Sequence, residues 1–160
     1  MATMIPNDVE EFHSEGERAF YKFLQSAGKP DSRYISWYLP DIKDKEPDFL
    51  LFCEDIGLVI FEVKDWTLSQ IREANPYSFT LDIGGKTESK KNPLQQAHDY
   101  LNSIMDKIRE DGQLVSREPQ FFGNPKIPIH CGVVFPHINK FEYTEKVEAP
   151  DSGNGNSVSR

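Results

Sequence analysis

The sequence predicts an α/β domain in which a mixed β-sheet is flanked by helices. Two segments, residues 7–28 and 92–110, carry apolar residues at three- and four-residue steps, which is the spacing of an amphipathic helix. Short runs rich in β-branched and aromatic residues lie between and after them. The order is helix, three strands, a polar hairpin, helix and strand, which implies helices layered on a sheet.

The chain has 160 residues, enough for one domain with a substantial core. Its hydrophobic content of 38% is typical of a folded protein. No apolar run reaches the length of a membrane span, so we expect no membrane partner and a cytoplasmic protein. We assign residues 1–148 to the domain, and we expect residues 149–160, which are rich in Gly, Ser and Asn, to form a flexible tail or linker.

The two cysteines, Cys53 and Cys131, are far apart in sequence, and each lies beside an apolar run. We expect buried reduced thiols rather than a disulfide or a zinc site. His130 and Cys131 are adjacent on a predicted strand, so they point to opposite faces and cannot bind one metal ion together.

The first helix is predicted to begin near Asn7 and to end by Gly28. The second is predicted to follow Asn92, a good N-cap residue with proline at the first helical position, and to end near Glu110. Outside the central hairpin, strands are predicted over residues 33–39 and 127–135, and a weaker, polar hairpin over residues 69–74 and 77–83 that ends at a Gly-Gly pair.

The most informative segment is a predicted hairpin from Asp48 to Lys64. Two apolar runs flank an acidic stretch that ends at Gly57. Side chains alternate between the faces of a strand, so Glu62 and Lys64 must share one face. If the loop has an odd number of residues, with Gly57 as its bulge residue, Asp48 lies opposite Glu62 on that face.

Two carboxylates that face each other across a ladder repel, at a cost of about 0.2–1 kcal/mol even at a wet surface. A cation between them removes this cost, and Asp and Glu oxygens suit Mg²⁺ or Mn²⁺. Lys64 could then hold a metal-bound water or neutralise phosphate charge. Alternatively, Lys64 simply pairs with Glu62 and Asp48 as a surface ion cluster that stabilises little. The apolar run before Glu62 predicts a strand buried on both faces, yet spacing alone leaves both interpretations open.

The net charge of −8 argues against a protein that coats nucleic acid non-specifically. It does not argue against a phosphate site, because a local basic rim and a metal ion can offset the field there. Lys86, Lys90 and Lys91 form one basic cluster, although lysines near a Gly-Gly turn usually belong to a solvated loop.

Four sequence blocks together resemble the nuclease-related domain family of the PD-(D/E)XK nuclease superfamily. In chain order they are Gly16-Glu17-Arg18-Ala19, Glu46-Pro47-Asp48, Glu62-Val63-Lys64 and Asn92-Pro93-Leu94-Gln95-Gln96. The resemblance spans roughly Phe12 to Phe135, and four blocks in the right order are far more specific than an Asp…Glu-x-Lys motif alone. It implies a restriction-endonuclease-like α/β fold with a central mixed sheet flanked by helices.

The resemblance also implies a Mg²⁺- or Mn²⁺-dependent nuclease that acts on DNA, with RNA as the other candidate substrate. Asp48, Glu62 and the backbone carbonyl of Val63 would bind the metal ion. Lys64 would position or activate the attacking water, and Glu17 would be an additional catalytic acid. Because family members also precede helicase, kinase or zinc-ribbon domains, a covalently linked helicase or other domain is an expected partner.

On the second helix, the resemblance implies that Gln96 contacts the nucleic-acid backbone or orients the site. Tyr100 lies four residues later on the same helical face and would share this role. Gln95 is the competing choice, but it faces outward on the helix. Lys90 and Lys91 complete the expected nucleic-acid-binding set.

Three features allow a different interpretation. Glu17 could belong to a capping box that begins at Ser14, although the expected earlier helix start opposes this. Trp66 could stack on a base, but packing at the sheet edge is the commoner role and the one that we expect. Asp65 departs from the neutral polar residue that the resemblance implies, and it supports an alternative in which a degenerate nuclease fold binds nucleic acid or a protein without cutting.

Overall fold

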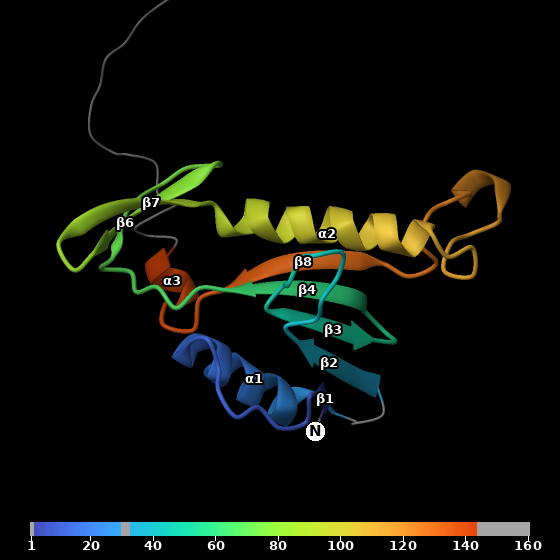
Figure 1. Ribbon diagram of the computed structural model, residues 1–160, viewed down its shortest axis with the longest axis horizontal. Coiled ribbons are helices and arrows are strands. Elements are labelled where there is room, and N and C mark those ends of the chain that lie inside the picture. The colour runs from blue at the N-terminus through green and yellow to red at the C-terminus, as the bar shows by residue number, and fades with distance from the viewer. Residues whose placement is uncertain (1, 30–32, 144–160) are drawn as a thin grey trace, which may run out of the picture.

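The computed structural model describes residues 2–29 and 33–143. A five-stranded sheet lies between two helices, and a smaller three-stranded sheet lies near the start of the second helix (Figure 1). Within the described residues, no helix has both the length and the apolar character needed to cross a bilayer. The elements in chain order are β1 (Thr3–Ile5), α1 (Glu15–Ala27), β2 (Tyr34–Tyr38), β3 (Phe49–Cys53), β4 (Gly57–Val63), β5 (Ile71–Ala74), β6 (Ser78–Ile83), β7 (Lys86–Lys91), α2 (Pro93–Arg109), the 3₁₀ helix η2 (Pro119–Phe121), β8 (Ile129–Val134) and α3 (Lys140–Tyr143).

The large sheet is mixed, as predicted. Its strand order is β1-β2-β3-β4-β8. The β2–β3 and β3–β4 pairs are antiparallel. The two outer pairs, β1–β2 and β4–β8, are parallel. The parallel β4–β8 pair requires a long crossover, and this crossover contains the small sheet and α2.

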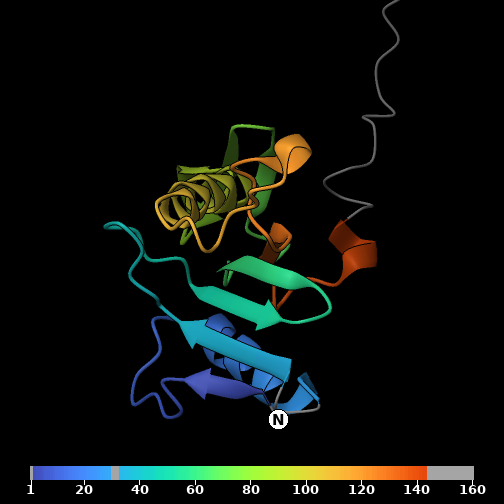
Figure 2. The same cartoon turned by 90° about the vertical axis from the view of Figure 1, so that its right-hand side faces the viewer.

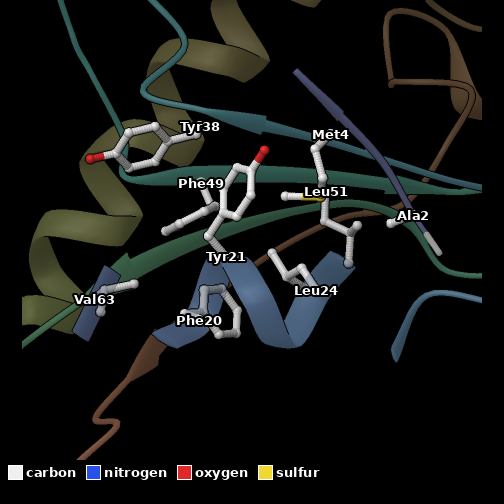
Figure 3. Packing of buried hydrophobic residues seen from close by; sticks show 9 residues of the cluster. All are labelled: Ala2, Met4, Phe20, Tyr21, Leu24, Tyr38, Phe49, Leu51 and Val63. Atoms are coloured by element: carbon white, nitrogen blue, oxygen red, sulfur yellow. The ribbon is translucent and has the colours of Figure 1, made fainter. Parts of the chain in front are cut away.

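The two helices cover opposite faces of the large sheet, which is clearest when the cartoon is viewed from the side (Figure 2). On one face, Phe20, Tyr21 and Leu24 of α1 pack against strand residues such as Phe49 and Leu51 (Figure 3). Each such apolar side chain contributes about 1.5–3 kcal/mol when fully buried.

On the other face, Ile104 and Ile108 of α2 pack against Ile60 of β4. Because side chains alternate along β4, Glu62 lies on this α2 face, whereas Val63 lies in the α1 cluster. This alternation decides which helix covers each functional residue.

The predicted start of the first helix is wrong. The helix begins at Glu15 rather than near Asn7, because Ser14 is the N-cap and its side chain accepts a hydrogen bond from the Glu17 backbone N–H. Val9 and Phe12 still pack against the α1 cluster, but from the irregular segment before the helix. Apolar spacing therefore extended the predicted helix into a segment that is buried without being helical.

The structure adds four elements that the sequence did not predict: β1, β7, η2 and α3. Residues 86–91, expected to be a lysine-bearing loop, form β7 and pair with β6. Gly84 and Gly85 have φ angles of 59° and 80°, the positive values that a two-residue hairpin turn requires. The strand lacks an apolar alternation, and backbone pairing across this turn forms it instead.

The other predicted elements are confirmed with small shifts of their ends. The central hairpin appears as β3–β4, the polar hairpin as β5–β6, and the last strand as β8. Both cysteines are free thiols, Cys53 buried and Cys131 half-buried. The predicted tail, residues 149–160, lies outside the described residues.

Candidate functional site

The β3–β4 hairpin has the register that the sequence predicted. Its loop is the three residues 54–56, and Cys53 pairs with Gly57, whose φ angle is 94°. A Cβ atom at Gly57 would lie 2.2 Å from the Pro128 carbonyl oxygen, so a side chain cannot fit there. The ladder runs to the Phe49–Phe61 pair, and the next residues outward are Asp48 and Glu62.

Glu62 is almost fully enclosed, with a side chain only 1% exposed. Its Oε1 atom forms an ion pair with Lys64 Nζ. Its Oε2 atom has no hydrogen-bond partner among the described residues. A buried polar atom without a partner costs about 1–3 kcal/mol, and more when it is charged, so this oxygen is suited to receive a ligand.

Asp48 is half-buried at the end of the same hairpin, and its Oδ2 atom accepts a hydrogen bond of 2.6 Å from the Val63 backbone N–H. The N–H and C=O groups of one strand residue point to the same side, so the Val63 carbonyl is also directed to the Asp48 side of β4. Burial, followed by the negative charge of Glu62, raises the pKa of Asp48 to about 7.

The two carboxyl groups together resist ionisation. Burial raises the pKa of Glu62 as well, while the hydrogen bond and the charge of Lys64 oppose that rise. A divalent cation would supply the missing positive charge. In the described ranges, no three Asp, Glu, His or Cys side chains converge on a common metal position. Asp48, Glu62 and the Val63 carbonyl are therefore the oxygen ligands that the site can offer.

Glu17 lies in the first turn of α1 and is buried. Both of its oxygens are occupied: Tyr38 donates to Oε2 at 2.6 Å, and the Ser14 hydroxyl donates to Oε1 at 3.2 Å. Ser14 therefore caps the helix as the capping-box interpretation requires, but Glu17 accepts from the Ser14 hydroxyl rather than from a backbone N–H. Its negative charge also raises the pKa of Asp48 and of Glu62, so Glu17 lies close enough to influence the pair electrostatically.

Gln96 and Tyr100 lie on one face of α2, as predicted, and Gln96 Nε2 donates to the Tyr100 hydroxyl at 2.9 Å. Burial raises the pKa of Tyr100, and the charges of Glu62 and Asp48 add to this rise. The first turns of α2 therefore lie near the carboxylate pair. Gln95 is exposed, whereas Gln96 is half-buried.

Lys90 and Lys91 lie apart from the hairpin carboxylates, on β7. Lys90 pairs with Glu88 at 2.7 Å, and Lys91 pairs with Asp99 of α2. Each lysine charge is offset by a neighbouring carboxylate, and their role in binding nucleic acid stays a prediction.

Asp65 and Trp66, which directly follow Lys64, each contact a partner elsewhere in the chain. The Trp66 ring lies 5.5 Å from that of Phe79 and packs as predicted. Asp65 pairs with His137, which the sequence reasoning did not identify as a partner. The sequence alone offered no signal for this contact, because it depends on the parallel β4–β8 register, in which Val63 pairs with Val134 and the residues after both strands come close.

Tyr38, which donates to Glu17, was also missed. Strand β2 pairs Tyr38 with Phe49, the neighbour of Asp48, so the tyrosine lies at the same end of the sheet as the carboxylates. The sequence alone does not fix the β2–β3 register, and without it this contact carries no signal.

The comparison with known families gives a match to the part of the chain that contains these residues. The model of the nuclease-related domain family matches residues 13–136, which include α1, the β3–β4 hairpin, α2 and β8. No curated protein and no solved structure gives a significant match. The match covers well over half of the chain and agrees with the mixed sheet flanked by helices. The chain therefore belongs to the nuclease-related domain family and has its nuclease-like α/β fold.

Proposed function

We propose that this domain is a Mg²⁺- or Mn²⁺-dependent nuclease that hydrolyses phosphodiester bonds in DNA. One observation carries the proposal: Glu62 Oε2 is buried, has no hydrogen-bond partner in residues 2–29 and 33–143, and lies in register with Asp48. Membership of the nuclease-related domain family supports the reaction class. RNA is the second candidate substrate, because the same metal chemistry cuts both backbones.

Asp48, Glu62 and the Val63 carbonyl would hold the metal ion. When bound, Mg²⁺ or Mn²⁺ supplies a Lewis acid for the phosphate and lowers the pKa of a water molecule. The residues present fit such an ion, because they offer hard oxygen ligands and a buried carboxyl oxygen for which the described part of the chain supplies no hydrogen-bond donor. The Val63 N–H fixes the orientation of Asp48, so the ligand set is partly arranged in advance.

Lys64 is the candidate for handling the attacking water. Its ammonium group lies on Glu62 Oε1, and its side chain is 20% exposed, so it is directed along the same face with a path to solvent. It can hold a water molecule there and offset negative charge that develops on the phosphate. Such contacts strengthen in the transition state, so they favour the rate more than ground-state binding.

Gln96 and Glu17 have supporting roles in this proposal. The Nε2 group of Gln96 has two hydrogens, one of which is directed to Tyr100, so the second can donate to a phosphate oxygen. Glu17 is held by Tyr38 and Ser14, and its charge increases the need of the carboxylate pair for a cation. We propose Glu17 as a positioning residue of the site.

A second candidate function is a degenerate nuclease domain that binds nucleic acid or a partner protein without cutting. The pairing of Lys64 with Glu62 favours it, because this contact partly satisfies the carboxylate without a metal ion. The presence of Asp48, Glu62 and Lys64 together on one face opposes it. We also propose a cytoplasmic setting and a linked helicase or other domain as the partner.

Calorimetric titration with Mn²⁺ tests the metal site. The wild type should bind Mn²⁺, and both Asp48→Asn and Glu62→Gln should weaken binding at least tenfold. Glu54→Gln is the matched control, because Glu54 is exposed in the loop at the opposite end of the same hairpin. Equal Mn²⁺ affinity in the wild type and both site variants would remove the metal site from the proposal.

A further inference from the structure

A pocket of about 740 Å³ opens beside the candidate metal site. Three parts of the chain line it: the β5–β6 hairpin, the start of α2, and the segment from β8 into α3. Its volume lies within the roughly 300–1,000 Å³ range of sites that enclose small organic ligands. None of the residues proposed to bind the metal ion lines it.

The pocket adjoins the carboxylates through the β4–β8 ladder. Val133, one of its lining residues, pairs directly with Glu62. Aligned residues of neighbouring strands point to the same face, so Val133 and Glu62 lie side by side under α2. On the other side of the pocket, Asn92 and Leu94 precede Gln96 by one turn or less. The pocket is therefore close enough to Glu62 to receive the nucleoside next to a phosphate that lies at this carboxylate.

Part of the lining is aromatic. Phe79, Phe135 and Tyr143 contribute rings to it, and Trp66 packs behind Phe79. The Phe135 and Tyr143 rings are stacked, with centroids 5.7 Å apart and planes 23° apart. Phe79 is only 3% exposed, so the half-buried Phe135 and Tyr143 present the apolar ring surface that suits a nucleobase, whichever base it is.

The polar groups of the pocket suit the edge of a base better than a phosphate. Asn139 lines the pocket and uses its Oδ1 atom to cap α3 by accepting from the Glu142 N–H, and its amide N–H groups are donors of the kind that recognise a base edge. Among the described lining residues, Lys140 carries the single charged side chain. A site for a phosphate would need more positive charge in a protein of net charge −8.

We infer that this pocket binds an unpaired nucleobase of the strand that is cut, next to the scissile phosphate. The inference rests on the proposed nuclease function and adds a substrate class to it. A base in a duplex is stacked and paired, so it enters such a pocket only after it has lost its stacking and pairing interactions. The domain therefore prefers single-stranded or locally unpaired substrates over a fully paired duplex.

Binding measurements separate this inference from catalysis. The probes are a fluorescein-labelled single strand of mixed sequence, the same strand with a central block of abasic sites, and the paired duplex. Ca²⁺ is supplied as an oxygen-binding cation, and anisotropy reports the affinity. The wild type should bind the intact strand roughly tenfold more tightly than either other probe, as expected from the loss of base stacking.

A variant that fills the pocket provides the second readout. Leu94→Trp places a larger side chain at a lining position that is 47% exposed, where the fold tolerates it. Leu114→Trp is the matched control, since Leu114 is 50% exposed and lies outside the pocket. Leu94→Trp should remove the preference for the intact strand, and Leu114→Trp should retain it.

Three results of the binding measurements would overturn the inference: equal affinity for intact and abasic strands, no binding of any probe, or an unchanged preference in folded Leu94→Trp. The comparison of intact with abasic strands needs no variant, so a folding defect cannot hide the answer. A wild type that shows the base preference but cuts nothing in Mn²⁺ refutes the proposed nuclease and supports the pocket. One that cuts duplex and abasic strands as fast as the intact strand supports the nuclease and refutes the pocket.

Discussion

Asp48→Asn should stabilise the metal-free protein at alkaline pH. Asp48 is half-buried and in register with Glu62, and burial together with that charge raises its pKa to about 7. Asparagine keeps an oxygen that can accept from the Val63 N–H, and its amide group can donate toward Glu62. The substitution therefore removes the repulsion while it keeps the hydrogen bond that orients the side chain.

The expected gain in stability follows from the difference between the pKa of Asp48 in the folded and in the unfolded protein. The unfolded chain releases the Asp48 proton near pH 3.8, whereas the folded protein releases it near pH 7. The folded state binds more protons between these values, so the wild type loses stability as the pH rises through this window. The full shift corresponds to about 4 kcal/mol at about 1.4 kcal/mol per pH unit. Because water screens the exposed part of Asp48, we expect a gain of about 1–3 kcal/mol.

Urea unfolding in EDTA, followed by circular dichroism, measures the difference between Asp48→Asn and the wild type at a series of pH values. The difference should be near zero at pH 4 and should reach its maximum above pH 7. Glu54→Gln should show no such trend, because Glu54 is exposed at the far end of the hairpin. A variant that is less stable than the wild type at pH 8, or a difference that does not change with pH, would refute the assigned repulsion.

Two further predictions concern the helices. Gln96→Ala should lower the affinity for nucleic acid. It should change the free energy of unfolding by less than about 1 kcal/mol, since Gln96 is half-buried and has a side-chain hydrogen bond with Tyr100. Loss of binding in Gln95→Ala instead would show that the role belongs to Gln95. Gly16→Ala should destabilise the fold by about 1–3 kcal/mol, because its Cβ would lie 2.8 Å from Asp65 Oδ1. Adding Asp65→Ala should recover part of that loss in a double-mutant cycle, and simple additivity would contradict the predicted clash.

The fold was predictable where local pattern and tertiary structure agree. The register of Asp48 with Glu62 was predicted on the condition that the loop has an odd number of residues with Gly57 as its bulge residue, and the three-residue loop of the structure meets that condition. The N-cap of α2 and the proline after it marked the start of that helix correctly.

The remaining elements depend on contacts that no local pattern encodes. Strand β1 has three residues and exists because β2 offers it a parallel edge. The polar strand β7 forms through backbone pairing with β6, so its lysines were expected in a loop. The early helix start was predicted because Phe12 fits a helical period, while Ser14 in fact ends the irregular segment by capping α1.

The candidate site was likewise predictable in part. The position of Glu62, Asp48 and Lys64 on one face followed from strand alternation. The partners of Glu17 and Asp65, which are Tyr38 and His137, depend on how separate elements meet at the end of the sheet. Sequence spacing alone does not give such long-range contacts, and they become visible only once the register of each strand pair is known.

The most direct test of the account is single-turnover DNA cleavage by the wild type and Lys64→Met in Mn²⁺. Methionine keeps the aliphatic length of lysine and removes the charge that pairs with Glu62. The account predicts that the wild type cuts DNA, and that Lys64→Met binds Mn²⁺ with similar affinity but loses cleavage by at least a hundredfold. Equal cleavage by both proteins, or no cleavage by a wild type that binds Mn²⁺ and DNA, would contradict it.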